Sequence, residues 1–94
     1  MLYTCPCCGY KTLSQEPPGT FDICLICGWE DDNVQFKDPE YKGGANKVSL
    51  HEAQKNFIKF GASDERSREL IRKPISEFEK DPKWVPLLKK LPAG

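Results

Sequence analysis

The sequence predicts a small α+β domain in which short β-hairpins precede one or two packed helices and a proline-containing tail. Three observations support this: two Cys-x-x-Cys-Gly units within the first 28 residues, a capped amphipathic segment at 49–60, and four prolines after residue 73. Ninety-four residues suit one domain. A chain this short buries only about 60–65% of the surface that its unfolded state exposes. Because only 38% of its residues are hydrophobic, we expect a bound metal or disulfides to help hold the fold.

Short β-prone runs surround both cysteine pairs. Residues 2–4 and 10–13 flank the first pair, and residues 20–23 lead into the second pair. Between them, Pro17-Pro18-Gly19 predicts a turn, because proline fixes φ and glycine relaxes the backbone. The pattern predicts two hairpin-like arms, over residues 3–32, that close on each other.

A helix is predicted to begin after Ser49 and to end at Gly61. Ser49 and Glu52 match the S-x-x-E capping box, in which each residue satisfies a backbone N–H of the other. Glycine is a common helix stop. Apolar residues at helical spacing form the predicted buried face: Leu50, Ala53, Phe57 and Ile58.

A second, shorter helix is predicted to follow, capped by Ser63 or Asp64 and ending before Pro74. The remaining residues, 75–94, form a C-terminal tail that can hold a short helix around Phe78. Three apolar residues of the tail are candidates for packing on the domain: Trp84, Leu87 and Leu88.

The two cysteine pairs predict a four-thiolate metal site. Cys5 and Cys8 form the first pair, Cys24 and Cys27 the second, and the 15 residues between Cys8 and Cys24 suit a two-knuckle zinc site. Each pair is followed by a glycine, which permits the left-handed backbone of a tight turn. Four sulfurs in a tetrahedron suit Zn²⁺ at about 2.3 Å. We predict one structural Zn²⁺ per chain in a zinc-ribbon or rubredoxin-like knuckle domain.

Other uses of the cysteines are weaker hypotheses. Iron is the alternative metal, because a set of four sulfur donors suits both ions. A Cys-x-x-Cys redox couple usually opens a helix in a βαβ unit, which this sequence does not show. Disulfides are disfavoured by the odd number of cysteines and by the absence of a signal peptide after Met1. We therefore expect a reducing, cytoplasmic setting.

Cys7 and His51 are the remaining candidate ligands. Cys7 lies inside the first knuckle, and we interpret it as a small side chain packed against the shell of the ion. It could instead be a reactive thiol or an alternative ligand, which makes thiol redox chemistry or metal handling through Cys7 an alternative function. His51 is the only histidine, and we expect it to be solvent-facing or hydrogen-bonded and not a ligand.

An acidic run, Trp29-Glu30-Asp31-Asp32, follows the second knuckle. Carboxylates can hold hard cations or transfer protons, but no second set of oxygen ligands is apparent. We interpret the run as a solvated acidic turn with Trp29 packed on the knuckle. Four cysteines would also close the coordination position that a catalytic zinc keeps open. A binding or structural role is therefore a stronger hypothesis than an enzyme.

Charge is distributed unevenly along the chain. Residues 1–42 have a net charge of −4 and residues 43–94 of +4, so the cysteine-bearing half is acidic. Affinity for nucleic acid comes chiefly from Lys and Arg at phosphates. We therefore expect a protein-interaction or assembly module, with a nucleic-acid-binding zinc ribbon as the alternative. No apolar run is long enough to predict a membrane span. The basic residues concentrate late in the chain: Arg66, Arg68, Arg72, Lys73, Lys89 and Lys90.

Four motifs occur in order: Cys5-Pro6-Cys7-Cys8-Gly9, Cys24-x-x-Cys27-x-Trp29-Glu30-Asp31-Asp32, Asp38-Pro39-x-Tyr41-x-Gly43-Gly44-Ala45-Asn46-x-Val48-Ser49-Leu50-x-Glu52-Ala53, and Asn56-Phe57-x-x-Phe60-Gly61-Ala62. Over roughly residues 3–74 the sequence resembles the bacterial cysteine-rich CPCC family. The resemblance implies a bacterial metal-binding domain and implies no particular activity. We place that domain at 1–74, with zinc knuckles at 3–32 and a helical part at 49–73, and the tail at 75–94.

Overall fold

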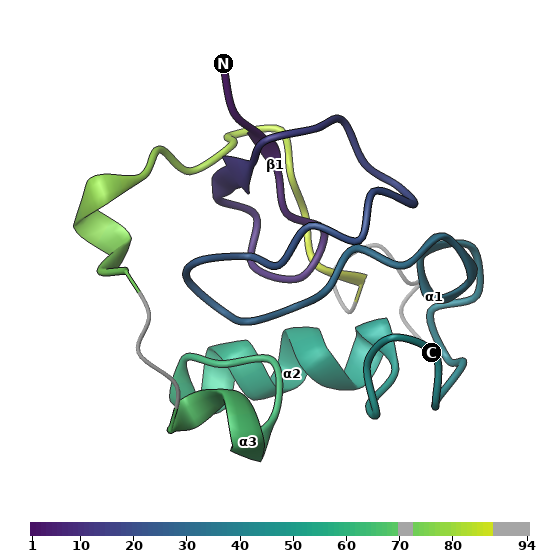
Figure 1. Ribbon diagram of the computed structural model, residues 1–94. Coiled ribbons are helices and arrows are strands. Elements are labelled where there is room, and N and C mark those ends of the chain that lie inside the picture. The colour runs from purple at the N-terminus through teal and green to yellow at the C-terminus, as the bar shows by residue number, and fades with distance from the viewer. Residues whose placement is uncertain (70–72, 88–94) are drawn as a thin grey trace.

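The computed structural model describes residues 1–69 and 73–87 and has the predicted α+β fold (Figure 1). Two irregular arms lie above one long helix, and later segments of the chain pack around them. None of the helices in the described part of the chain has the length and apolar character needed to traverse a bilayer. The elements in chain order are β1 (Tyr3–Thr4), β2 (Lys11–Leu13), α1 (Asn33–Lys37), α2 (Leu50–Phe60), α3 (Glu65–Arg68) and a 3₁₀ turn (Ile75–Glu77).

Both predicted arms are present, but they contain little regular strand. In the first arm β1 pairs antiparallel with β2, with Tyr3 opposite Leu13 and an irregularity before Thr4. The second arm has a single antiparallel bridge between Ile23 and Glu30. Short strands suffice here because each arm only has to aim one cysteine pair at the other.

α2 begins and ends as predicted. The Ser49 side chain accepts a hydrogen bond from the N–H of Glu52 at 3.0 Å, which caps the first turn. Gly61 ends the helix in a left-handed conformation, with φ of 82°, and its N–H donates to the carbonyl of Phe57. The helix crosses beneath the two arms in Figure 1, so its inner face is available to the cysteines.

The inner face of α2 differs from the predicted one at two positions, Ile58 and Gln54. Leu50 and Ala53 are buried in the cluster that contains the cysteines, and Phe57 packs against it. Ile58 is exposed, so its predicted burial was wrong. Gln54, which was not predicted to face inward, is buried, and its amide donates to the carbonyl of Pro6 at 2.9 Å. Periodicity alone could not reveal that an amide has a partner inside.

The interpretation of residues 29–32 as a solvated acidic turn was wrong for two of the three carboxylates. Asp31 and Asp32 are buried. One oxygen of Asp31 accepts both the backbone N–H and the hydroxyl of Thr20, at 2.9 and 2.7 Å. Asp32 caps α1 by accepting the N–H of Gln35, and its other oxygen accepts the N–H of Ala45. The N–H and hydroxyl of Thr20 and the N–H groups of Gln35 and Ala45 therefore compensate for burying these acids. Trp29 is buried in the cysteine cluster, as predicted.

Gln35 in α1 organises the long connection to α2. Its side chain is fully buried, and its amide nitrogen lies within 3.1 Å of the carbonyls of Tyr41, Asn46 and Val48. Its amide oxygen accepts from the backbone and side-chain nitrogens of Asn46. The Asn46 side chain in turn bonds both backbone groups of Glu30, just after the second knuckle. The connection is therefore attached to the second arm.

α3 and the tail each lie against one knuckle. Asp64, one of the two predicted caps, accepts the N–H of Ser67 at 2.8 Å and begins α3. Residues 79–81 run beside the first arm: the N–H of Lys11 donates to the carbonyl of Glu79, and the N–H of Asp81 donates to the carbonyl of Gly9. Leu87 packs against the core cluster. Several residues named in the predictions lie outside the described ranges: Arg72, Leu88, Lys89 and Lys90.

Candidate metal centre

The two knuckles have the same backbone hydrogen bonds. In the first, the N–H of Cys5 donates to the carbonyl of Tyr10, and the N–H of Gly9 donates to the carbonyl of Cys5, both at 2.9 Å. Both bonds recur in the second knuckle at 2.9 and 3.0 Å, with Cys24, Trp29 and Gly28 in the equivalent positions. The two glycines have φ of 81° and 82°, the left-handed conformation that each turn requires.

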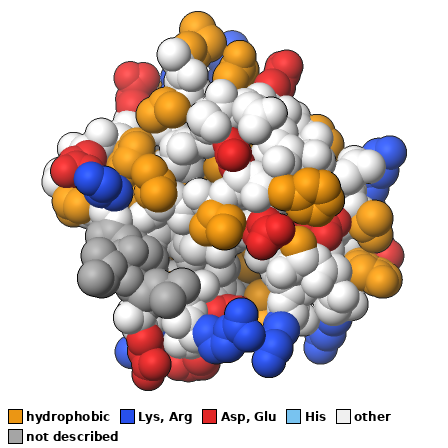
Figure 2. Space-filling model, viewed as in Figure 1, with side chains coloured by type: hydrophobic (Ala, Val, Ile, Leu, Met, Phe, Trp, Pro, Cys, Tyr) orange, Lys and Arg blue, Asp and Glu red, His pale blue; other side chains and the backbone are white. Residues whose placement is uncertain are grey.

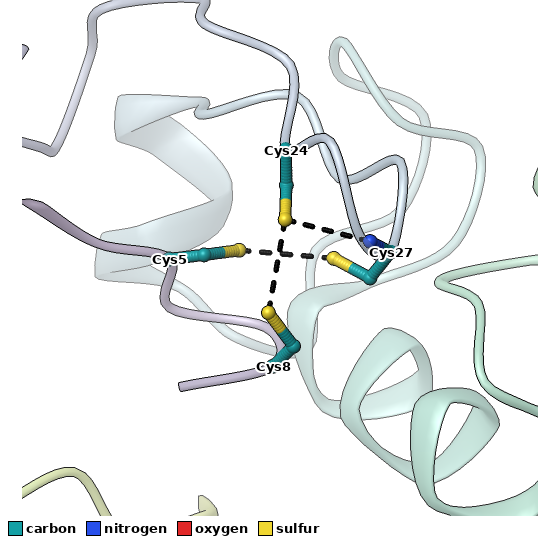
Figure 3. A group of neighbouring side chains, drawn as sticks. All are labelled: Cys5, Cys8, Cys24 and Cys27. Carbon is teal, nitrogen blue, oxygen red and sulfur yellow. Dashed lines mark hydrogen bonds between the residues drawn. The ribbon is translucent and has the colours of Figure 1, made fainter. Parts of the chain in front are cut away.

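The knuckles bring four cysteine sulfurs into one group, which is drawn in Figure 3. All four are buried, and their Sγ atoms lie within 4.8 Å of one another. Cys5 and Cys27 approach at 3.7 Å, as do Cys8 and Cys24. Each close contact joins one sulfur from each knuckle. A tetrahedral ion with metal–sulfur bonds of about 2.3 Å needs sulfurs about 3.8 Å apart, so these four thiols can bind a metal ion.

Burial and mutual contact set the ionisation of the sulfurs. Burial raises the pKa of the Cys5 and Cys27 thiols well above the usual range, and a hydrogen bond with Cys24 raises the pKa of Cys8. Contacts from Cys27, Cys5 and Cys8 lower the pKa of Cys24. Without an ion, the buried group of four cysteines thus favours one ionised thiol over several. A bound divalent cation would stabilise four thiolates together.

Close packing behind each knuckle explains why both turns end in glycine. A Cβ on Gly9 would lie 2.4 Å from the Trp84 ring, and one on Gly28 would lie 2.6 Å from the Ser67 hydroxyl. The Trp84 indole N–H also donates to the carbonyl of Pro6 at 3.1 Å. Trp84 of the tail therefore covers the first knuckle, and Ser67 of α3 covers the second.

Cys7 and His51 do not join the four sulfurs. Cys7 is fully buried, but its thiol is not part of the metal-binding group found among the described residues. The His51 ring pairs through Nδ1 with Glu40, which is a hydrogen-bonded role. The centre also contains a residue that the sequence did not point to. Thr12 donates its hydroxyl to the Cys24 sulfur at 3.1 Å, and no motif distinguishes it from an ordinary strand threonine.

Comparison with known proteins adds one match. The family model described as Cysteine-rich CPCC matches residues 3–77, a span that includes both knuckles, α1, α2 and α3. No curated protein matches the chain.

Proposed function

The chain belongs to the cysteine-rich CPCC family, and from that starting point we propose that it is a zinc protein whose single Zn²⁺ is structural. The chain is a small metal-binding protein because its four buried Sγ atoms have the spacing of a tetrahedral site. Zinc is favoured over iron because paired Cys-x-x-Cys units with this separation are usual for structural zinc. Four protein thiolates would leave no coordination position for a substrate, so the ion would hold the arms together and would not take part in catalysis.

Metal analysis tests this proposal. We expect protein purified without chelator to contain one equivalent of zinc, and Co²⁺ substitution to give the absorption bands of tetrahedral thiolate coordination. Cys7→Ser serves as the matched control, since it removes a thiol outside the group of four and should keep the full equivalent of zinc. Less than half an equivalent of metal, with no gain after zinc is added, would contradict the proposal. A full equivalent of iron would support the four-cysteine site as a metal site but would contradict its assignment to zinc.

We further propose that the zinc-stabilised domain is a protein-interaction or assembly module that works in the cytoplasm. Support comes from the second arm, where Phe21, Ile23 and Leu25 lie within five residues and are 60%, 58% and 48% exposed. Three large apolar side chains exposed so close together in the chain are typical of a contact surface. Phe21 also has φ of 61°, an unfavourable conformation for a bulky residue.

Charge supports a protein partner over nucleic acid. On the face shown in Figure 2, acidic and basic side chains are interspersed, and neither sign covers it. The arms belong to the half of the chain with net charge −4, which would repel phosphates. The alternative function through Cys7 is weakened by its complete burial, because oxidants and alkylating reagents need access to the sulfur.

Site-specific crosslinking tests the interaction proposal. A photo-crosslinking residue at Ile23 should give one discrete adduct in the native host, and the same residue at Lys59, on the exposed side of α2, should not. Equal labelling from both positions, or none from Ile23, would contradict the proposed surface. Nucleic acid is tested separately at about 50 mM salt, where we expect no binding tighter than the non-specific range of about 10⁻⁴–10⁻⁶ M. Salt-sensitive, sub-micromolar binding would favour the nucleic-acid alternative.

A further inference from the structure

Thr12 connects the first arm to a sulfur of the second knuckle. It lies in β2 and is buried, and its hydroxyl donates to the Cys24 Sγ across the interface between the arms. The backbone N–H groups of Ile26 and Cys27 also point at this sulfur, at 3.4 Å each. Cys24 therefore receives three donors, two from its own turn and one from the other arm.

The first knuckle lacks this arrangement, although its backbone bonds are the same. Cys5 is the equivalent of Cys24, since each donates its N–H to the carbonyl five residues later. Among the described residues, the structure records no hydroxyl or backbone N–H donor at the Cys5 sulfur, whose recorded contacts are the other sulfurs of the group. The four-sulfur site is thus asymmetric, and within residues 1–69 and 73–87 Thr12 contributes the only side-chain hydroxyl recorded at it.

We propose that Thr12 is a positioning residue for the metal centre, holding the Cys24 thiolate in place through its hydroxyl; this inference rests on the proposed metal binding. A donor to a metal-bound thiolate withdraws negative charge from the sulfur and fixes its direction. The effect is strong in a buried site, where water cannot replace the lost donor. Thr12 also makes the geometry of the centre depend on correct packing of the two arms.

An ordering of the four ligands follows from this asymmetry. The Cys24 sulfur, with three donors, is the least nucleophilic and the most firmly held. Exchange with a chelator should therefore begin at the other three sulfurs. Losing the Thr12 hydroxyl should loosen Cys24 as well and speed metal release.

Substitutions that separate the hydroxyl from the shape of the side chain test the proposal. Thr12→Val keeps the shape and removes the donor, whereas Thr12→Ser keeps the donor. Thr4→Val is the matched control, because the Thr4 hydroxyl donates to Asp81 and not to a sulfur. Each variant is titrated with Co²⁺ and then with Zn²⁺ in competition with a chelator. Far-UV circular dichroism follows the fold.

We expect Thr12→Val to bind Zn²⁺ about 10–100-fold more weakly, the usual cost of losing a partner of a metal ligand. Its sulfur-to-Co²⁺ charge-transfer band should move to longer wavelength, because the Cys24 thiolate becomes easier to oxidise. Thr12→Ser should restore both values, and should restore folding if Thr12→Val does not fold. Wild-type affinity and spectrum in Thr12→Val, or equal defects in Thr12→Ser or Thr4→Val, would overturn the role of Thr12. A wild-type protein that gives no tetrahedral Co²⁺ spectrum would instead overturn the proposed metal binding.

Discussion

At the residue scale, the five buried cysteines are expected to differ widely in their contribution to the free energy of unfolding. Replacing Cys8, Cys24 or Cys27 with serine should remove most of the stability, because a structural zinc contributes about 10–16 kcal/mol in small domains. Cys7→Ser buries a hydroxyl in place of a thiol and should cost about 1–3 kcal/mol. Urea unfolding and metal content measure both effects. Equal damage from Cys7→Ser would mean that Cys7, and not a neighbour, is the ligand in the first knuckle.

Gly9 gives a second prediction at this scale. Gly9→Ala should be more destabilising than Gly43→Ala, although the two residues have similar φ values of 81° and 87°. Both variants carry the left-handed strain of about 1–2 kcal/mol. Only Gly9→Ala would also press against Trp84, since nothing lies within 4 Å of a Cβ on Gly43, and such overpacking adds about 1–3 kcal/mol.

The two glycine variants are compared by chemical denaturation and by the indole N–H signal of Trp84 in NMR spectra. The signal should shift in Gly9→Ala as the hydrogen bond to Pro6 weakens, and should stay in place in Gly43→Ala. Equal stability of the two variants with an unmoved indole signal would show that Trp84 does not pack on the knuckle.

At the element scale, α1 depends on tertiary hydrogen bonds. Gln35→Leu should cost about 3 kcal/mol or more, because several partly buried backbone groups of the connection lose their partner at about 1–3 kcal/mol each. Gln15→Leu is the control, since Gln15 is exposed and its side chain should contribute little. Thermal unfolding measures the difference. Similar losses in the two variants would show that the connection is held by other contacts.

The sequence could predict the elements that depend on local signals, and not those that depend on distant contacts. The bounds of α2 follow from local signals, the Ser49–Glu52 box and Gly61, so they were confirmed. α1 was missed because it is only five residues long and depends on Gln35. The Gln35 side chain bonds to Tyr41 and Val48, which lie in the connection between α1 and α2. Asp31 and Asp32 were expected in solvent because two of their backbone donors, Thr20 and Ala45, lie 11 and 13 residues away in the chain. Cysteine spacing identified the two knuckles, whereas Thr12 reaches Cys24 only once the arms have packed.

At the scale of the whole molecule, the knuckles connect segments from all parts of the described chain. The carbonyl of Pro6 accepts hydrogen bonds from Gln54 of α2 and from Trp84 of the tail, at 2.9 and 3.1 Å. The N–H of Ser63, ahead of α3, donates to the carbonyl of Cys27. α2 is 11 residues long, and an isolated helix shorter than about 12–15 residues is marginal in water. The arms and α2 should therefore be stable only together.

Chelation of the metal, followed by far-UV circular dichroism, tests this central claim most directly. If a bound ion holds the arms and the arms hold α2, the helical signal should disappear in one transition that coincides with metal release, and excess zinc should restore it. A helical signal that survives complete removal of the metal would contradict the account, because α2 would then fold independently of the metal centre.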